Sequence, residues 1–554
     1  MQRLIFQGNL DEFNFFGRRT WGFVQQLFGK KISGLFTIPS GIVATEVSTL
    51  EKIAKEIPEI GILTTKSIGP EPRAGNKEPI VGQPSPFAII NAVGLTNPGA
   101  DEFASRLSRI KIPEDKFLLI SIFGKDEKEF YAVAKKLTLY ADGFELNISC
   151  PHAEGCGLAV GQDIALVERI VRAVVSLGKP TVIKLAPSVD IEKTIKQAVK
   201  AGIKGVTAIN TKGPVPYLHD GQPVLSNQVG GLSGQPILPL GLASVKRVRA
   251  VTDLPIIACG GIRTAKEVEQ YRAAGANYFG IGSALAGMSF AEIKDYFRSL
   301  STDFKNQTNY AEGFLKTETR MKYSGYRVAN VDKFNDNVFI LKLNKKIQAK
   351  PGQFVFLWLP GKGEKPFSVF DDEPLTLFIQ NRGCFSSELA KLKVGDKIYV
   401  RGPYGNSPPT EGKILLVGGG TGVAAMYLFA KKYPQTVALL GAKDKSHLLY
   451  KKFQPVCLQV HLHTESGDIG HKGLVTDDLE KILQEFKPDY CFNCGPAVMV
   501  KRVIEQESRY VNPENIYSSL EMLTKCGTGL CGSCANSKGY RNCVDGSFLK
   551  PKQI

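Results

Sequence analysis

Four cysteines near the end of the chain have the spacing of a metal-binding loop. In the stretch KCGTGLCGSCANSKGYRNC they are Cys526, Cys531, Cys534 and Cys543, spaced C-x4-C-x2-C-x8-C. The first three match the plant-type [2Fe-2S] spacing, in which a glycine-rich loop carries four thiolates to two irons. Zinc is the alternative, but zinc sites more often pair two C-x2-C-like knuckles. The spacing therefore favours an iron–sulfur cluster.

Polar and reactive residues also follow several short apolar runs in the first half of the chain. One lysine or asparagine at a strand end means little, but buried amides and charges need partners, so a whole set at separate strand ends is hard to explain as packing. We therefore expect a site there. Its candidate residues are Lys66 in ILTTKS, Asn91 in INAVGLTNPG, Asn147 and Cys150 in LNISCP, Lys184 in VIKLAP, and Asn210 with Thr211 in AINTKG.

Cys150 ends the run FELNISC, immediately before a proline. A free cysteine is usually a small buried apolar residue. Its place at a strand end, three residues after Asn147, favours instead a thiol that exchanges a proton with a substrate, provided that the site favours the thiolate. Cys156 and Cys259 have no such context, and we interpret them as structural.

Glycine-rich turns form a third set of candidates. Two of them follow the last apolar runs of the first region, and a third, LLVGGGTGVAAM, joins a strand to a helix start, where a pyrophosphate can bind. The turn FNCGPAVMV follows a later strand. The turn residues are Gly234; Gly260 and Gly261; Gly282 and Ser283; Gly418, Gly419, Gly420, Thr421 and Gly422; and Cys494, Gly495 and Pro496.

The elements that must position the first set are nine apolar runs between about residues 35 and 285, separated by helical stretches. Runs buried on both faces and separated by helices indicate parallel strands in βα units, and their number predicts an α/β fold, a (β/α)8 TIM barrel. Such a barrel has eight strands, so we expect the first run, GLFTIPSGIV, to lead into it. The site then lies where the strands end, and the turns after the last two strands form the phosphate site.

The pattern changes after a polar helix and linker near residues 295–315. Shorter alternating strands follow, among them NVFILKL, GQFVFLWL and DKIYVRGPYGN, which predict a small antiparallel β-barrel. From residue 413 onward, a strand, a glycine-rich turn and further βα units predict a nucleotide-binding α/β domain. The last forty residues are irregular and hold the cysteine cluster.

Composition and charge exclude several classes of function. The 554 residues have a formal net charge of +17, but no run of five basic residues occurs, which argues against a nucleic-acid partner. No apolar run has the roughly 18 residues of a membrane helix, and the start lacks a signal-peptide pattern. An odd number of cysteines, eleven, is a poor disulfide framework.

We expect a cytoplasmic protein. We expect its aromatic and basic segment 13–31 to pack against a neighbouring domain; docking on a membrane surface is the alternative.

The turns of the second half resemble those of ferredoxin reductase-like proteins, in which the CGP turn borders the nicotinamide. Upstream, KPFSVF and GCFSSEL resemble the two flavin motifs of that family. The family's first motif begins with arginine, and a lysine here keeps the positive charge but loses the bidentate fork. The resemblance implies FAD contacts at Lys365, Pro366, Phe367, Ser368, Gly383 and Ser386.

With the cysteine cluster at the end, residues 320–554 resemble the electron-transfer subunit of class 1B dihydroorotate dehydrogenases. Residues 35–290 resemble the catalytic subunit of class 1 dihydroorotate dehydrogenases. The second resemblance implies FMN in the barrel, Cys150 as the acid/base, and Lys184 as the residue that stabilises negative charge on the reduced flavin. It also implies pyrimidine or flavin-edge contacts at Lys66, Asn91, Asn147, Asn210 and Thr211, carboxylate contacts at the amides of Gly94 and Leu95, and FMN contacts at Ser40, Gly41, Ser67 and the barrel glycine turns.

His152 departs from this family, which usually has asparagine here in contact with the substrate. The stretch SCPH…GLAVGQD resembles instead the pyrimidine-reducing domain of dihydropyrimidine dehydrogenases, which reduce uracil and thymine. The loop NAVGLTNPG and the fused reductase favour dihydroorotate. His152 then replaces the asparagine's hydrogen-bond donor or, when protonated, contacts the carboxylate.

The resemblance implies an electron route from FMN to [2Fe-2S], then FAD, then NAD, and a homodimer formed through the barrels. We expect NAD rather than NADP in this route, because Asp444 in GAKDKSH suits a ribose hydroxyl; NADP is the alternative, because the two neighbouring lysines suit a 2′-phosphate. Two different functions also remain compatible with the motifs: a non-catalytic electron-transfer protein, and a reductase of an unrelated enoate-like substrate. The expected domains are the barrel over 1–305, a linker over 306–322, the FAD-binding barrel over 323–410, the NAD-binding domain over 411–512 and the cluster domain over 513–554.

Overall fold

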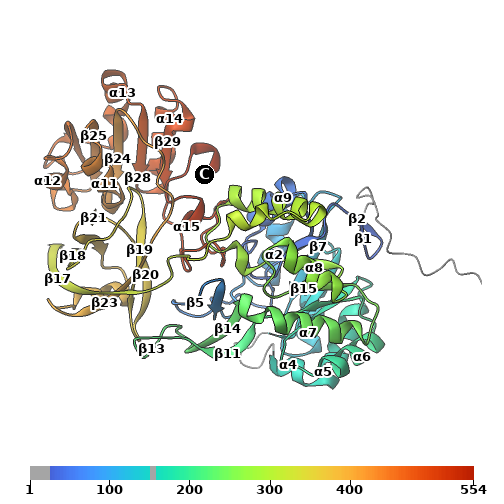
Figure 1. Ribbon diagram of the computed structural model, residues 1–554. Helices are drawn as coiled ribbons and strands as arrows, with labels where there is room; N and C mark the ends of the chain where they lie inside the picture. Colours follow the sequence, from blue (N-terminus) through green and yellow to red (C-terminus); the bar gives the residue numbers. More distant parts are fainter. Residues whose placement is uncertain (1–24, 150–157) are drawn as a thin grey trace, which may run out of the picture.

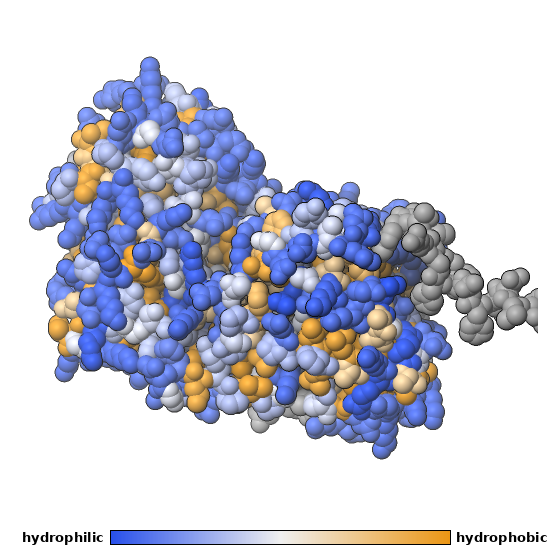
Figure 2. Space-filling model, in the orientation of Figure 1, coloured by the Kyte–Doolittle hydropathy of each residue, from blue (hydrophilic) through white to orange (hydrophobic). Residues whose placement is uncertain are grey.

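The computed structural model describes residues 25–149 and 158–554. Cys150, His152 and Cys156 lie outside the described residues, as does the aromatic segment up to residue 24. In the described residues, the chain forms two halves joined through the region near residues 306–322, as Figure 1 shows. Most of the face drawn in Figure 2 is hydrophilic, and hydrophobic side chains gather only in small groups. No helix among the described residues has the length and apolar character to cross a membrane.

The predicted barrel is confirmed. Eight parallel strands pair in chain order, and the last pairs with the first to close the ring. Strands such as β4 and β7 are buried at every position, which is why their sequences are continuously apolar. The strands are β3 (Phe36–Ile38), β4 (Ile60–Thr64), β7 (Phe117–Ile122), β8 (Gly143–Asn147), β9 (Thr181–Leu185), β10 (Gly205–Ala208), β15 (Ile256–Cys259) and β16 (Tyr278–Gly280).

The prediction about the surplus apolar run was wrong. The first run, GLFTIPSGIV, contains β3 and belongs to the barrel. The surplus run is FAIINAVGL, whose strand β6 (Ala88–Asn91) pairs antiparallel with β5 (Val81–Ser85) and β14 (Val229–Gly234) in a separate sheet. An apolar run reports burial but not its partner, so the sequence pattern could not separate the two cases.

Helices surround the barrel. Three of them begin at aspartates, Asp126, Asp163 and Asp190, whose side chains accept hydrogen bonds from backbone N–H groups in the first turn. The helices of this half are α1 (Val47–Glu56), α2 (Ala100–Leu107), α3 (Glu127–Leu137), α4 (Leu158–Gln162), α5 (Ile164–Val175), α6 (Ile191–Ala201), α7 (Leu238–Arg249), α8 (Ala265–Ala273) and α9 (Phe290–Asn306), with short 3-10 turns at Gln235–Ile237, Ser283–Leu285 and Tyr310–Phe314.

A hairpin closes the amino-terminal end of the barrel. It consists of β1 (Gln25–Leu27) and β2 (Lys30–Ile32). Leu27 and Ile32 pack into the barrel interior, and Tyr278 on β16 donates a hydrogen bond of 2.8 Å to Gln26 O. The described part of the segment 13–31 therefore packs on the barrel itself.

A small sheet stands beside the other end of the barrel. Its order is β11-β14-β6-β5, with β11 at Lys212–Pro216. A further hairpin of β12 (Leu218–His219) and β13 (Gln222–Pro223) extends from it toward the second half of the molecule (Figure 1). There, Asp220 accepts hydrogen bonds from Lys397 (2.8 Å) and Tyr399 (3.0 Å).

The second half starts with a seven-stranded sheet of order β20-β19-β23-β17-β18-β22-β21, whose strand pairs are antiparallel as predicted. Its hydrogen-bonded ladder ends at β20 and β21, so the strands pair as an open sheet rather than a closed barrel. The strands are β17 (Ser324–Asn335), β18 (Val338–Leu343), β19 (Phe354–Leu359), β20 (Gly363–Ser368), β21 (Asp371–Asp372), β22 (Leu375–Gln380) and β23 (Lys397–Tyr404), and α10 (Cys384–Ala390) follows β22.

A six-stranded parallel sheet of order β27-β26-β25-β24-β28-β29 follows. Alternate residues of β24 pack on its two faces, Leu416 on one and Leu415 on the other, and both faces are covered by helices. The sheet continues to Ser519, past residue 512, where we expected the cluster domain to begin. The elements are β24 (Ile414–Gly419), α11 (Tyr427–Lys432), β25 (Thr436–Ala442), α12 (Tyr450–Phe453), β26 (Gln459–Thr464), β27 (His471–Lys472), α13 (Val475–Phe486), β28 (Tyr490–Cys494), α14 (Ala497–Glu507) and β29 (Ile516–Ser519), with 3-10 turns at Gly420–Met426, Lys445–His447 and Pro513–Asn515.

The remaining residues form an irregular segment, which we call the cluster segment (residues 520–554). It contains α15 (Asn542–Asp545) and a 3-10 turn at Pro551–Gln553. Several of its buried side chains, including Leu530 and Val544, belong to the same hydrophobic core as the barrel, whereas Phe548 packs in the core of the second half. The cluster segment therefore packs against the barrel although it is last in the chain.

Candidate functional site

A pocket opens at the carboxyl ends of the barrel strands. It encloses about 1090 Å³ of space free of protein atoms, including the part open to solvent. The structure brings to this pocket every described residue that we predicted for the substrate and FMN. These are Ser40, Gly41, Lys66, Ser67, Asn91, Gly94, Leu95, Asn147, Lys184, Asn210, Thr211, Gly234, Gly260, Gly261, Gly282 and Ser283.

Two lysines supply the positive charge of this pocket. Lys66 is 8% exposed and Lys184 is 4% exposed. Lys184 Nζ lies 3.8 Å from Glu145 Oε1. Glu145 is on β8, two positions before Asn147. Buried cations beside polar amides and glycine turns suit an anionic, hydrogen-bonding ligand, so the residues fit a flavin phosphate and a flavin ring.

A buried hydrogen-bond chain positions Asn147. Its Nδ2 donates to Ser67 Oγ at 2.8 Å, and the hydroxyls of Ser67 and Ser121 lie 2.9 Å apart. Ser121 Oγ in turn donates to Glu145 Oε1 at 3.0 Å. The chain fixes the amide of Asn147 at the pocket wall, because each buried polar group in it has a partner.

A second chain connects two of the predicted asparagines. Asn210 Nδ2 donates to Ser149 Oγ at 2.8 Å, and this hydroxyl donates to Asn147 Oδ1 at 3.1 Å. The two amides are therefore held relative to each other across β8 and β10. Ser149 directly precedes Cys150 in the sequence, so the described hydrogen bonds reach the residue before the predicted acid/base.

Sequence reasoning missed two residues here: Cys259, which lines the pocket, and Glu145, which is buried beside the pocket lysine Lys184. The signal for Glu145 was present, because a carboxylate inside the apolar run FELNIS requires an inward partner. Cys259 lines the pocket at the end of β15, and burial raises the pKa of its thiol to about 12. It is therefore a neutral thiol at physiological pH, in keeping with a packing role.

The four cysteines of the cluster segment come together in a buried loop. Each is at most 5% exposed. Cys534 Sγ and Cys543 Sγ lie 3.4 Å apart, and the backbone N–H of Gly529 donates to Cys543 Sγ at 3.2 Å. Hydrogen bonds from the Cys531 and Cys543 thiols hold the pKa of Cys526 well below its ordinary value. Four buried sulfurs with N–H donors suit the thiolate ligands of an iron–sulfur cluster.

The turn that carries Cys531 packs on the segment just after β3. Val43 N donates to Leu530 O at 2.7 Å, and Thr45 Oγ1 donates to Cys531 O at 3.1 Å. Residues 40–42, immediately before, line the pocket. One short stretch of chain therefore separates the barrel pocket from the cysteine loop.

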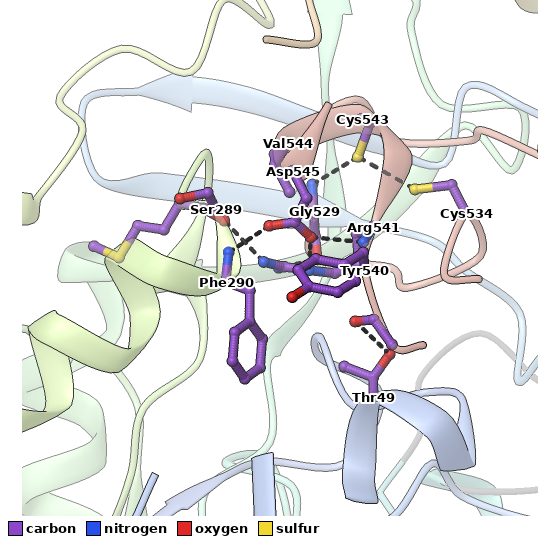
Figure 3. A network of polar contacts seen from close by, with 12 residues as sticks. Thr49, Ser289, Phe290, Gly529, Cys534, Tyr540, Arg541, Cys543, Val544 and Asp545 are labelled. Atoms are coloured by element: carbon purple, nitrogen blue, oxygen red, sulfur yellow. Dashed lines mark hydrogen bonds and ion pairs between the residues drawn. The ribbon is translucent and has the colours of Figure 1, made fainter. Parts of the chain in front are cut away.

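Arg541 ties the cysteine loop to α9, as Figure 3 shows. Its guanidinium donates hydrogen bonds of 3.0 Å to Gly529 O in the loop and to Met288 O in the barrel half. Asp545 lies 3.5 Å from Arg541 Nε and accepts a hydrogen bond from Phe290 N. Arg541 is fully buried, so this charge pair holds the loop rigidly on the barrel.

The two predicted FAD motifs lie next to each other. The rings of Phe367 on β20 and Phe385 on α10 stack with centroids 6.4 Å apart. Ser386 Oγ accepts a hydrogen bond from the backbone N–H of Gly383 at the start of α10. Lys365 forms an ion pair of 2.7 Å with Glu78 of the barrel half, so its ammonium group also contributes to the contact between the halves.

The two predicted nucleotide turns meet at the carboxyl ends of β24 and β28. Gly418 pairs with Cys494 in register, and a Cβ on Gly422 would lie 2.6 Å from Cys494 O. The chain passes from β24 to β25 on one side and returns to β28 on the other. This is the switch point of an open parallel sheet, where nucleotides bind. The turn after β24 continues as a 3-10 helix rather than the predicted α-helix start.

Comparison with known proteins gives matches to both halves. A family profile described as dihydroorotate dehydrogenase matches residues 23–300. The catalytic subunit of dihydroorotate dehydrogenase B (NAD(+)) from Pyrococcus abyssi is 37% identical over 284 residues, which are 51% of this chain and 93% of that protein. The probable electron transfer subunit from Pyrococcus furiosus is 37% identical over 222 residues, which are 39% of this chain and 86% of that protein.

Among solved structures, the NADH-dependent reduced ferredoxin-NADP oxidoreductase includes a chain that is 30% identical to this one. The similarity covers 41% of this chain and 89% of that chain, with a TM-score of 0.38. The curated relatives show that this chain fuses regions similar to two separate subunits. The chain belongs to the dihydroorotate dehydrogenase family.

Proposed function

We propose that this chain oxidises dihydroorotate to orotate and passes the electrons to NAD. FMN occupies the barrel pocket, a [2Fe-2S] cluster occupies the cysteine loop, and FAD and NAD occupy the second half. The observation that carries the proposal is the contact between the pocket wall and the cysteine loop, where Val43 and Thr45 hold the loop beside residues that line the pocket. The relatives named as catalytic and electron transfer subunits support the same division of roles.

The reaction removes a proton from C5 and a hydride from C6 of the substrate. When bound, FMN supplies the hydride acceptor, and the cluster supplies one-electron transfer to FAD. Cys150, which follows Asn147 by three residues in the sequence, takes the C5 proton as a thiolate. The amides of Asn147 and Asn210 bind the pyrimidine edge, in the positions that the Ser67 and Ser149 hydroxyls hold them.

The buried lysines orient the anions. Lys66 lies at the pocket wall near the substrate, and Lys184 stabilises negative charge that develops on the flavin side. Glu145 keeps the Lys184 side chain directed along the barrel interior through their 3.8 Å contact. The amides of Gly94 and Leu95 bind the substrate carboxylate, which uracil and thymine lack.

The remaining assignments follow from the same proposal. The domain limits are those expected from the sequence, with the NAD-binding sheet extended to Ser519. The protein forms a homodimer through the barrels and works in the cytoplasm, where free cysteines stay reduced.

Anaerobic titration of the flavin absorbance tests the function. Dihydroorotate should bleach the flavin, dihydrouracil should not, and a subsequent addition of NAD should restore the colour. Bleaching by dihydrouracil alone would replace the proposal with a uracil or thymine reductase. Absence of bleaching by either substrate, with FMN retained, would leave a non-catalytic electron-transfer protein.

The variant Cys150→Ser tests the acid/base role. It should retain FMN, and the rate of flavin bleaching by dihydroorotate should fall about a hundredfold or more, since general acid–base catalysis contributes about 10²–10⁴-fold to reaction rates. Cys457→Ser, a half-buried cysteine of the second half, is the matched control and should bleach as the unmodified protein does. Unchanged bleaching in Cys150→Ser would overturn the role of this thiol.

A further inference from the structure

Three of the six histidines lie close together at one edge of the six-stranded sheet. His461 and His463 are on β26, and His471 begins the edge strand β27. His463 and His471 are directly opposite each other in the parallel pairing of the two strands, so their side chains share a face. Their ring centroids lie 5.1 Å apart.

Asp478 on α13 completes this group. Its Oδ2 lies 3.0 Å from Nε2 of His463 and 3.6 Å from Nδ1 of His471. One carboxylate oxygen is therefore near two imidazole nitrogens that come from two strands. The three ligand atoms lie within 4.8 Å of one another.

These separations fit a tetrahedral metal ion. With metal–ligand bonds of about 2.0–2.1 Å, neighbouring ligand atoms of a tetrahedral zinc site lie about 3.3 Å apart. The two distances to Asp478 Oδ2, 3.0 and 3.6 Å, lie on either side of this value. The side chain of His471 is half exposed, so its movement can bring the three atoms to one ion.

The burial of the group differs from that of an ordinary surface ion pair. His463 is 2% exposed, and its Nδ1 has no hydrogen-bond partner among the described residues. Among the described residues, the contact between His463 Nε2 and the Asp478 carboxylate is therefore the polar contact that orients the buried His463 ring. Asp478 and His471 are partly exposed, which leaves room for a water molecule as a fourth ligand.

We propose that His463, His471 and Asp478 bind a divalent transition-metal ion of the zinc class, with water in the remaining position. Two imidazoles and one carboxylate are ligands that zinc accepts readily. The ion binds neutral imidazoles and the ionised carboxylate, so its binding releases any proton held between them.

The loop between β26 and β27 links the site to the segment around Asp444, which we expected to contact the nucleotide. In this loop, Asp468 accepts hydrogen bonds from Lys445 N at 3.0 and 3.1 Å, next to Asp444. A metal ion that joins β26, β27 and α13 would hold both ends of that loop. The ion therefore stabilises the short edge strand, which has two residues and little pairing of its own.

Equilibrium dialysis against zinc tests this proposal on the full chain with its cofactors bound. Zinc and iron are measured in the same samples by elemental analysis. The unmodified protein should hold one more equivalent of zinc per chain than His471→Ala or Asp478→Asn, and removal of one ligand should weaken binding at least about tenfold. Zinc should also raise the thermal unfolding midpoint of the unmodified protein but not of these two variants.

The matched controls are His447→Ala and Glu480→Gln. His447 is a histidine of the same half that lies outside the group, and Glu480 is another carboxylate on α13, paired with Arg509. Both should bind zinc as the unmodified protein does. Equal zinc content and affinity in the unmodified protein and in both site variants would overturn the proposal, because the zinc would then lie elsewhere. An unchanged iron content in all samples shows that zinc has not replaced iron in the cysteine loop.

Discussion

The guanidinium of Arg401 donates a hydrogen bond of 2.8 Å to the main-chain oxygen of Cys526. The same side chain makes a bidentate ion pair with Glu364, with distances of 2.6 and 2.7 Å, and it lies 3.9 Å above the ring of Phe356. Both charged side chains are almost completely buried. One cation on β23 thus connects the seven-stranded sheet of the second half to the loop that carries the cysteines.

Replacement of Arg401 by methionine should strongly destabilise the second half. Removal of one partner from a buried ion pair leaves the other charge unpaired and costs about 3–5 kcal/mol. Urea unfolding, followed by the fluorescence of Trp358 in this sheet, measures the change. Lys397→Met, an exposed lysine on the same strand, is the control and should shift the midpoint little. Equal shifts in the two variants would contradict the importance of the buried pair.

Replacement of Gly539 by alanine should separate the cluster segment from the barrel. Gly539 has a positive φ of 79°, and an added Cβ would lie 2.7 Å from Ser48 O on α1. Because the obstacle is backbone, the loop must move away. We expect unchanged flavin content and a several-fold slower reduction of the cluster after dihydroorotate is mixed with the protein, as measured by stopped-flow absorbance.

Gly361→Ala is the matched control for this change. Gly361 has a similar positive φ of 74°, but a Cβ there would meet nothing within 4 Å. Both variants carry the same backbone strain, and only Gly539→Ala has the clash. Equal electron-transfer rates in the two variants would show that the contact with α1 does not position the cluster.

Replacement of Cys543 by serine should remove the metal cluster without removing FMN. Cys543 accepts from Gly529 N and lies beside Cys534, so it is one of four converging sulfurs. Iron and acid-labile sulfide per chain should fall, and the barrel flavin should remain. The control variant Cys384→Ser changes an exposed cysteine outside the loop, and its iron content should match that of the unmodified protein. Zinc in place of iron in the unmodified protein would refute the iron–sulfur assignment.

Stability should fall as pH rises through the titration of Glu507. This carboxyl lies at the end of α14, is fully buried, and accepts a hydrogen bond of 2.9 Å from Asn493. Burial raises its pKa from 4.5 to about 8. The folded state therefore retains a proton that the unfolded state releases between these two values. The loss of stability across that window is on the order of a few kcal/mol and is complete above pH 8.

The variant Glu507→Gln should abolish this dependence, because glutamine keeps the hydrogen bond with Asn493 and does not ionise. Its unfolding midpoint should exceed that of the unmodified protein at pH 8.5 and match it more closely at pH 5. Glu505→Gln, an exposed position on the same helix, should retain the fall. A parallel pH profile for Glu507→Gln and the unmodified protein would argue against the raised pKa.

The polar residues at the barrel strand ends could be found without the structure. In a parallel barrel all strands run in one direction, so residues that follow different strands, such as Lys66 and Asn210, must meet at one end. For these residues, local pattern and chain direction suffice. The Gly418 and Cys494 turns were instead paired through their resemblance to ferredoxin reductase-like proteins, and the structure shows that their strands, β24 and β28, are neighbours.

Pairing between distant strands could not be derived in that way. FAIINAVGL and GLFTIPSGIV are both apolar runs, yet β3 closes the barrel and β6 joins a separate sheet. Glu145 was missed for a related reason, since its partners Lys184 and Thr207 come from other strands. Burial explains why each run is apolar, but it does not determine which other strand the run pairs with.

By itself, the sequence determined the eight-stranded barrel, the cysteine spacing and the residues at the strand ends, because these depend on local periodicity and on a few side-chain types. The tertiary structure alone decided that the last residues of the chain pack on α1 and α9 of the first half, through Arg541, Thr45 and Lys52. It also decided that His463, His471 and Asp478 meet. These contacts depend on how whole domains and neighbouring elements pack, and no local pattern of residues encodes that packing.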